Sequence, residues 1–289
     1  RLTEIVSRVK NEDGEYEEET KTFTYDAMGN PVAYEGKAAA WTKGRQLMYL
    51  NGVTFGYNGQ GQRIAKTQGS TTNNFTYDMS GKLVKESRGV EYYYDAEGVC
   101  GMKYDEEMYF YRKDVFGNIT EILDSDGAVV VRYRYDAWGN HVVLNPNGSR
   151  NESSTFIGNI NPFRYRGYYY DTETKLYYLK TRYYDPKIGR FITIDDISYL
   201  APDTINGLNL YAYCGNNPVM NVDPNGTFIV SLLLTIVVGS VLAASSSILV
   251  QWATTGTVNW AQVGISALFG AVAGALSFIG IGGFAGQFL

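Results

Sequence analysis

The chain has 289 residues, enough for one large domain or two ordinary ones, and its formal net charge of −5 lacks the basic footprint of a nucleic-acid-binding protein. The single histidine, His141, argues against a His-based catalytic triad and is expected on a strand or at the surface. Cys100 and Cys214 lack the spacing of a metal site. We therefore expect two free or buried thiols, and no metal or cofactor.

The composition indicates a β protein. The sequence contains 25 tyrosines and 32 glycines but only 7 prolines, a balance typical of many short strands joined by tight turns. It begins with Arg1 rather than Met, and no signal peptide is visible at its start. These features indicate a piece of a longer protein.

One pattern recurs in the first half of the chain: an aromatic residue, any residue, Tyr, Asp, two further residues and Gly. The two rings stand two positions apart, so they project from the same face of a strand. Asp and Gly are favoured at the first and fourth positions of a type I turn. Each copy therefore predicts a hairpin, with turns at Asp26–Gly29, Asp78–Gly81, Asp95–Gly98 and Asp136–Gly139.

Weaker copies lie at Phe55–Gly61 and at Tyr109–Arg112, the second followed by Phe116–Asn118. One hairpin cannot bury its aromatic face alone, so neighbouring hairpins should pair side by side. The prediction is a mainly β fold built on a long, curling antiparallel sheet. An alternative use of the rings is a sugar-binding surface, which would need them exposed.

A denser series of motifs follows the repeats. It comprises Phe163–Asp171, Leu176–Leu179, Arg182–Pro186, Gly189–Phe191, Asn209–Tyr213, Asn216–Pro218 and Asp223–Gly226. Together with the tyrosine–aspartate repeats, this series resembles the YD repeats and the Rhs-associated core domain of Rhs proteins and teneurins. The resemblance covers roughly residues 15–226.

The resemblance implies a hollow β-shell made of a spiralling sheet, closed at one end by a strip from the core domain. It also implies that the tail beyond Asp-Pro-x-Gly is an effector held inside the shell, and that an immunity protein is a further partner. Bacterial members are secreted or surface-borne and act in contact-dependent competition or as insecticidal toxin subunits. The expected domains are a YD-repeat region over 1–150, a core domain over 151–226 and a tail over 227–289.

Some bacterial relatives cut themselves just after Asp-Pro-x-Gly, with aspartates of the core domain. On the matching motifs, the resemblance assigns catalytic roles to Asp195, Asp223 and Arg182, and places the cut between Gly226 and Thr227. Two carboxylates held close can share one proton, so that one acts as base and the other as acid.

The sequence departs from these self-cleaving relatives at two positions. Asp196 follows Asp195 where the family has proline, and Thr227 stands where self-cleaving members have a large apolar residue. The alternative is that the aspartates only form turns and ion pairs that hold the core strip in place.

Charge ends abruptly at Asp223, because residues 224–289 contain no Lys, Arg, Asp or Glu. Residues 228–250 are apolar over a length that can span a bilayer, and a second apolar stretch begins at Trp260 after a polar break at 254–259. Gly270 and Gly274 have the spacing of close helix–helix contacts in lipid, and Trp252 and Trp260 flank the break. The prediction is a helical hairpin that contacts a target membrane; the alternative is a buried helical pair.

Three functions remain open at this stage. The first is a shell and delivery module without multi-turnover chemistry, which the apolar tail favours. The second is a single-turnover aspartyl autoprotease. The third is a cell-surface adhesion or carbohydrate-binding repeat protein, the role that the eukaryotic relatives suggest.

Overall fold

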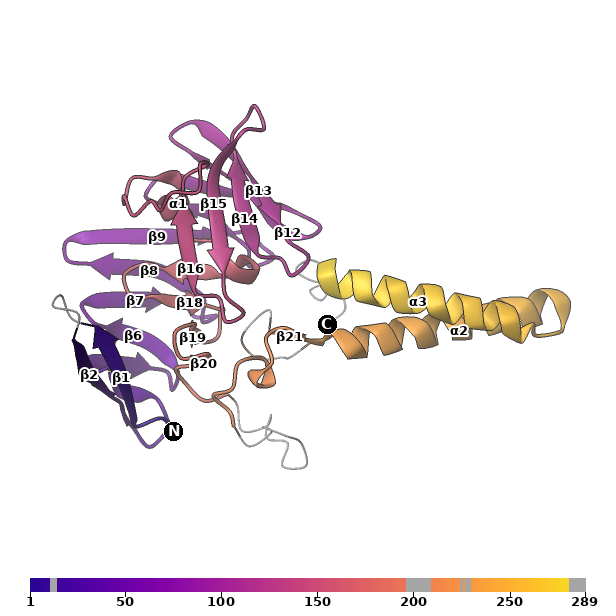
Figure 1. The fold of residues 1–289 in the computed structure, drawn as a ribbon, viewed down its shortest axis with the longest axis horizontal. Helices are drawn as coiled ribbons and strands as arrows, with labels where there is room; N and C mark the ends of the chain where they lie inside the picture. Colours follow the sequence, from indigo (N-terminus) through magenta and orange to yellow (C-terminus); the bar gives the residue numbers. More distant parts are fainter. Residues whose placement is uncertain (11–14, 196–208, 224–225, 227–229, 281–289) are drawn as a thin grey trace. The chain divides into compact units, whose positions relative to one another are not determined.

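The computed structural model describes residues 1–10, 15–195, 209–223, 226 and 230–280. The chain is mainly β, and two helices follow the strands (Figure 1). This agrees with the predicted fold class.

A 14-stranded antiparallel sheet follows the chain order from β3 to β16 and does not close into a barrel. The hairpins predicted from the repeats are its building blocks, and β1 (Glu4–Lys10) and β2 (Tyr16–Thr22) form a separate hairpin before it. The strands of the large sheet are β3 (Thr24–Tyr25), β4 (Pro31–Tyr34), β5 (Lys37–Thr42), β6 (Gln46–Leu50), β7 (Val53–Tyr57), β8 (Arg63–Gln68), β9 (Thr71–Tyr77), β10 (Leu83–Glu86), β11 (Val90–Asp95), β12 (Gly98–Tyr104), β13 (Glu107–Lys113), β14 (Ile119–Leu123), β15 (Val129–Tyr135) and β16 (His141–Leu144).

The turns have the geometry that their aspartate and glycine predict. At Asp78, the amide of Gly81 donates to the aspartate carbonyl (3.1 Å), and the carboxylate accepts from the amide of Lys82 (2.8 Å). Gly81 has φ of +77°, which favours glycine. The copies at Asp26 and Asp136 repeat these bonds.

The copy at Asp95 also forms a hairpin turn, but a tighter one. Strand β11 reaches Asp95 and β12 starts at Gly98, so only Ala96 and Glu97 lie between the strands. The carboxylate of Asp95 here accepts a hydrogen bond from the amide of Glu97 (2.8 Å).

The repeated aromatic pair alternates as predicted. In β9, Phe75 is buried, Thr76 is exposed and Tyr77 is half-buried. The hydroxyl of Tyr77 donates to the backbone carbonyl of Arg63 on the neighbouring strand (2.7 Å). Equivalent bonds run from Tyr57 to Leu47 (2.9 Å) and from Tyr135 to Ile119 (2.7 Å). The repeat tyrosines therefore connect adjacent strands. The first aromatic residue of the repeat, such as Phe75, is buried, which argues against a sugar-binding role for that ring.

The chain forms two compact units that interleave along the sequence. Unit 1 comprises Arg1–Glu91, Tyr169–Tyr213 and Asn225–Thr227, and unit 2 comprises Tyr92–Tyr168, Cys214–Pro224 and Phe228–Leu289. The domain boundaries expected after residues 150 and 226 stay predictions.

The core of unit 1 lies between the YD hairpins and a small four-stranded antiparallel sheet, the core strip. Two aromatic pairs join the two layers: Phe75 with Tyr169 (ring centroids 5.7 Å apart) and Phe55 with Tyr183 (5.6 Å). The core strip consists of β17 (Tyr169–Asp171), β18 (Leu176–Tyr178), β19 (Tyr183–Asp185) and β20 (Arg190–Phe191).

Unit 2 packs the short helix α1 (Ile157–Ile160) against β15 and β16. Glycine is required at Gly158, because a Cβ there would lie 2.6 Å from Val131 and 2.7 Å from Val143. The turn η1 (Tyr165–Gly167), the turn η3 (Cys214–Asn216) and the paired strands β21 (Asn221–Val222) and β22 (Val230–Ser231) also belong to this unit.

The lone histidine and both cysteines have the structural roles expected of them. His141 lies on β16 and contacts the guanidinium of Arg164. Cys100 and Cys214 are free thiols, the first half-buried and the second buried.

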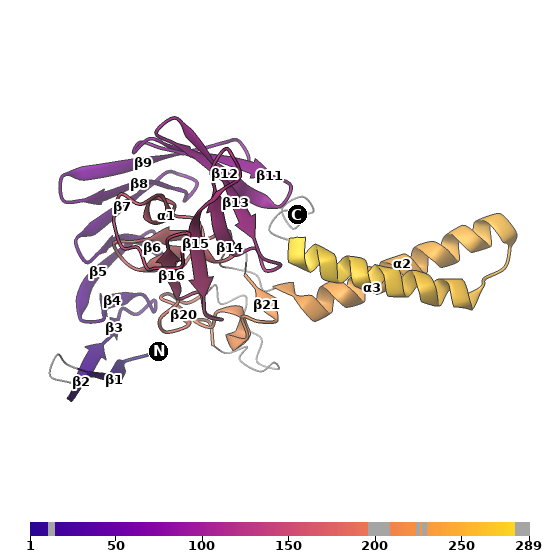
Figure 2. The same cartoon turned by 45° about the horizontal axis from the view of Figure 1, so that its top comes forward.

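The tail forms the predicted helical pair. Helix α2 (Leu232–Thr255) and helix α3 (Trp260–Gly280) lie side by side in both views (Figures 1 and 2). The chain reverses direction over residues 256–259, inside the polar break seen in the sequence.

Candidate functional site

The arginine that the sequence singles out, Arg182, is buried in unit 1 just before β19. The centre of its guanidinium lies 3.5 Å from the centroid of the Phe191 ring, so the planar cation is held against an aromatic face. The backbone of the preceding loop is fixed by a bond from the amide of Leu179 to the carbonyl of Arg182 (2.9 Å).

The guanidinium of Arg182 has polar partners on each of its nitrogens. One terminal nitrogen pairs with the carboxylate of Asp195 (2.7 Å), and the other donates to the carbonyl of Leu210 (3.2 Å). The Nε–H donates to the backbone carbonyl of Gly226. One buried cation therefore connects the predicted catalytic aspartate to the carbonyl of the peptide bond predicted to be cut.

Gly226 fits only as glycine. It has φ of +78°, and a Cβ would lie 2.8 Å from the hydroxyl of Thr181 and 3.2 Å from the carbonyl of Leu179. The left-handed backbone and the close approach together hold the Gly226 carbonyl at the arginine.

Asp223 belongs to unit 2, where its residue is buried and its backbone carbonyl accepts a hydrogen bond from the hydroxyl of Tyr168 (2.8 Å). Asp196 and Thr227, at which the sequence departs from the family, lie outside the described residues. The structure thus brings together Arg182, Asp195 and Gly226 within unit 1. Asp223 lies in unit 2 and is described there separately.

The chemistry available at Arg182 is electrostatic. A cation that donates to a peptide carbonyl polarises it and would stabilise the oxyanion of a tetrahedral intermediate. The same arrangement would also serve as a purely structural clamp between the core strip and the segment after it. The catalytic roles of Asp195, Asp223 and Arg182 stay predictions.

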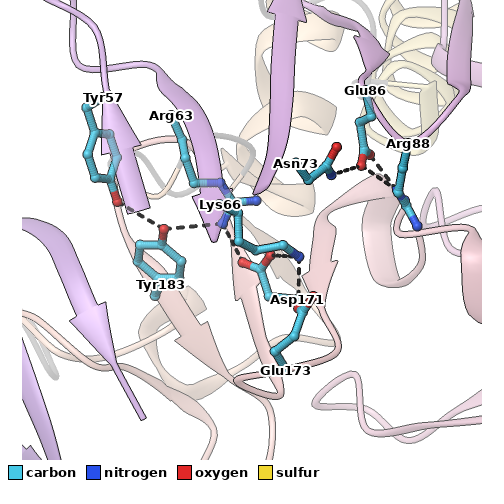
Figure 3. Close-up of polar contacts among 9 residues, drawn as sticks. All are labelled: Tyr57, Arg63, Lys66, Asn73, Glu86, Arg88, Asp171, Glu173 and Tyr183. Carbon is cyan, nitrogen blue, oxygen red and sulfur yellow. Dashed lines mark hydrogen bonds and ion pairs between the residues drawn. The ribbon is translucent and has the colours of Figure 1, made fainter. Parts of the chain in front are cut away.

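A second group of buried charges, the Arg63 cluster, links β8 to the core strip (Figure 3). It consists of Arg63, Lys66, Asp171 and Glu173. Arg63 and Asp171 are almost wholly buried and lie 2.5 Å apart, and Lys66 pairs with Asp171 (3.0 Å) and Glu173 (2.8 Å). Burial alone would raise the pKa of Asp171, but the charges of Arg63 and Lys66 outweigh it and lower that pKa.

Aromatic rings surround the Arg63 guanidinium. Its centre lies 4.3 Å from the Tyr178 ring centroid and 4.9 Å from that of Tyr169, and it also donates to the Tyr183 hydroxyl (3.3 Å). Sequence reasoning missed this cluster. A signal existed in β8, where Arg63 occupies an inward position while its neighbour Ile64 points outward.

Among the described residues, no group of three or more His, Cys, Asp or Glu side chains could hold a metal ion.

Comparison with known proteins supplies a family. The sequence matches the teneurin YD-shell family over residues 3–152 and again over residues 90–219. The tRNA nuclease WapA of Bacillus subtilis is 36% identical over 221 residues, which cover 72% of this chain and 8% of WapA. The double-stranded DNA deaminase toxin A of Burkholderia cenocepacia is 25% identical over 300 residues, covering 77% of this chain and 20% of the toxin.

An animal protein is also similar: salivary gland surface protein 1 of Aedes aegypti is 29% identical over 250 residues, 76% of this chain and 7% of that protein. Among solved structures, the crystal structure of TcdB2-TccC3 aligns with a TM-score of 0.53 at 21% identity, over 78% of this chain and 13% of that chain. This likeness shows a shared fold. The chain spans less than a tenth of the length of WapA.

Proposed function

This chain belongs to the teneurin YD-shell family of Rhs/YD-repeat proteins, and we propose that it is part of the shell and delivery module of a secreted toxin. The core strip supports this proposal most directly. It lies against the YD hairpins of unit 1 through aromatic pairs and through the Arg63 cluster, as expected for a strip that closes a repeat shell. The toxins among its relatives support the assignment to a toxin.

In this role the shell encloses and presents its own C-terminal segment as effector. Secretion or display at the bacterial cell surface and an immunity protein as partner follow from the same class. The apolar tail supports enclosure, because the described part of α2 has no buried residues and needs a cover before delivery.

Enclosure can be tested by cysteine accessibility in the intact chain. Leu242→Cys on α2 should react with a small maleimide but not with a polymer-linked one, whereas the exposed turn variant Met79→Cys should react with both. The parent chain measures the background from Cys100 and Cys214. Equal reaction of both variants with the bulky reagent would contradict enclosure.

Self-cleavage is a second candidate function, favoured by one observation: Arg182 contacts both Asp195 and the carbonyl of Gly226. In this proposal Asp195 and Asp223 supply the acid and base, water attacks the Gly226 carbonyl carbon, and the proton goes to the amide nitrogen of Thr227 as the peptide bond breaks. The reaction is a single-turnover hydrolysis.

Intact-mass measurement of the purified chain tests this function. The expected products end at Gly226 and begin at Thr227, and Asp195→Asn should abolish them. Asp185→Asn is the matched control, because Asp185 is a buried core-strip aspartate that bonds the hydroxyl of Tyr34 (2.5 Å) instead. Cleavage that survives both Asp195→Asn and Asp223→Asn would rule out the aspartyl mechanism. A chain that stays intact over days would leave Arg182 as a clamp.

A further inference from the structure

We propose that the α2–α3 hairpin is a bilayer-inserting element that enters lipid with its turn first, so that this chain carries a membrane-active tail. The proposal rests on the proposed role of the chain in toxin delivery. The family match ends at residue 219, before either helix, so the tail is argued from its own residues.

Length and charge fit a lipid bilayer. Helix α2 has 24 residues and α3 has 21, so at about 1.5 Å per residue each is as long as the ~30 Å hydrocarbon core. Of the described helices, Ile236–Thr255 is long and apolar enough to cross a membrane, and Trp260–Ala275 is a shorter apolar stretch. No charged residue follows Asp223, so no charge would have to cross with the turn.

The apolar side chains point away from the helix pair as well as into it. None of the Ile236–Thr255 stretch is buried, and a helix that is apolar on all sides needs a cover of protein or lipid. The exposed large side chains are Val237, Val238, Val241, Leu242, Leu249, Val250, Trp252, Trp260, Ile265, Leu268, Phe269 and Val272.

Three serine hydroxyls of α2 bond to their own helix. The hydroxyl of Ser240 donates to the carbonyl of Ile236, that of Ser245 to Val241, and that of Ser246 to Leu242, each at 2.8 Å. A hydroxyl that returns to the carbonyl four residues earlier needs no water, which lowers the cost of placing serine in hydrocarbon.

Polar groups of the turn also pair with each other and with the helix ends. The side-chain oxygen of Gln251 accepts from the amide of Asn259 (2.6 Å), and the side-chain oxygen of Asn259 accepts from the amide of Ala261 (3.0 Å). An uncharged turn with paired polar groups can pass through a bilayer at a lower cost than one carrying Lys or Asp. Trp252 and Trp260 flank it, at the level where aromatic residues anchor in the far interface.

Glycine brings the two helices into backbone contact. A Cβ on Gly239 would lie 2.2 Å from the Gly270 carbonyl oxygen and 3.1 Å from the Cα of Gly274. Such contacts stabilise helix pairs in lipid, where apolar side chains gain nothing from leaving the solvent.

The experiment places a cysteine at the turn of the helical hairpin in the full chain, in Thr257→Cys. Met79→Cys, in the exposed turn between β9 and β10, is the reference. Each chain is added to phosphatidylcholine vesicles, once from buffer and once by dilution out of denaturant, so that insertion does not depend on release from a shell. A membrane-impermeant maleimide is supplied either outside the vesicles or trapped within them. The parent chain gives the background from the native thiols.

We expect Thr257→Cys to react with the trapped reagent and to lose its reaction with the outside reagent, with no change between low and high salt. Met79→Cys should react from outside only. Within the Thr257→Cys background, Gly270→Leu should reduce insertion and Gly264→Leu should not, since a Cβ on Gly264 meets nothing within 4 Å. If Thr257→Cys reacts only with the outside reagent, both when added from buffer and when diluted from denaturant, the proposal is wrong. Insertion that occurs only after dilution from denaturant would support both the bilayer-inserting hairpin and its enclosure in the folded chain. Enclosure is tested separately, by the cysteine accessibility of the intact chain in buffer.

Discussion

Tyrosine–aspartate pairs occur both in the hairpins and in the core strip, and the aspartate side chain has a different role in each. In the hairpins the aspartate caps its own turn near the surface, as Asp78 does. In the core strip the aspartate is buried and reaches across to the large sheet, as Asp171 does to Arg63 and Asp185 to Tyr34. The same dipeptide therefore forms turns in the repeats and long-range ties in the strip.

Replacing Asp171 tests the first of these ties. Asp171→Asn leaves Arg63 buried without its counter-charge and Lys66 with that of Glu173 alone, so it should lower the free energy of unfolding by about 3–5 kcal/mol at neutral pH. The measurement is chemical denaturation of the full chain. The loss should shrink as pH falls through the lowered folded-state pKa of Asp171, where the parent carboxylate is also neutral.

The matched control is Glu173→Gln, which touches the same Lys66 from a more exposed position. It should change stability by about 1 kcal/mol or less. If the two variants lower the free energy of unfolding equally, the buried Arg63–Asp171 pair does not stabilise the contact between the core strip and the large sheet. The double variant Arg63→Met with Asp171→Leu should recover part of the loss, because it removes both charges from the core.

Asp185 predicts the opposite dependence on pH. Burial raises the pKa of Asp185, so ionising this carboxyl destabilises the folded state. The free energy of unfolding contributed by the neutral carboxyl is therefore lost as pH rises through its folded-state pKa. Asp185→Asn keeps an oxygen that can accept from Tyr34 and carries no charge. Relative to the parent, this variant should gain stability as pH rises from acid to neutral. A relative loss over the same range would show that Tyr34 and the Lys187 amide more than compensate the buried charge.

At the scale of the hairpin, the sequence predicts the structure because local rules suffice. The turn at Asp136–Gly139 and the alternation along β9 depend only on residues within a few positions of each other. The Arg63 cluster could not be predicted in this way, because Arg63 and Asp171 are 108 positions apart and an arginine in a strand is ordinarily solvated. The contact of Arg182 with Gly226 likewise joins residues 44 positions apart, although the family motifs pointed to Arg182.

The repeat tyrosine offers a test at this scale. Tyr77→Phe removes only the hydroxyl that bonds the carbonyl of Arg63, so it should cost about 1 kcal/mol of unfolding free energy. Tyr93→Phe is the control, since the Tyr93 side chain is exposed on the outer face of β11. Denaturation curves of the two variants should differ. Indistinguishable curves would mean that water replaces the tyrosine–carbonyl bond at no cost.

At the scale of the whole chain, each compact unit is built from segments that are not contiguous in the sequence. Unit 1 takes residues from before and after the Tyr92–Tyr168 segment of unit 2, so the core strip packs on hairpins that lie much earlier in the sequence. Strip residues such as Asp171 then complete a core that the first 91 residues leave open, through pairs such as Phe75 with Tyr169. Slow, late docking of the strip is expected from such long-range contacts.

The helical tail, by contrast, should be dispensable for the β core. A chain that stops after Ser231 keeps the β21–β22 pair and lacks both helices. Since the described part of α2 contributes no buried residues, the midpoint of thermal unfolding, followed by loss of the β signal in circular dichroism, should stay within a few degrees of the parent. The shortened chain should also lose all binding to phosphatidylcholine vesicles, because it lacks the charge-free helices. If it instead unfolds or aggregates while the parent chain stays monomeric, the helices belong to the core of unit 2, and the membrane role of the tail would have to be abandoned.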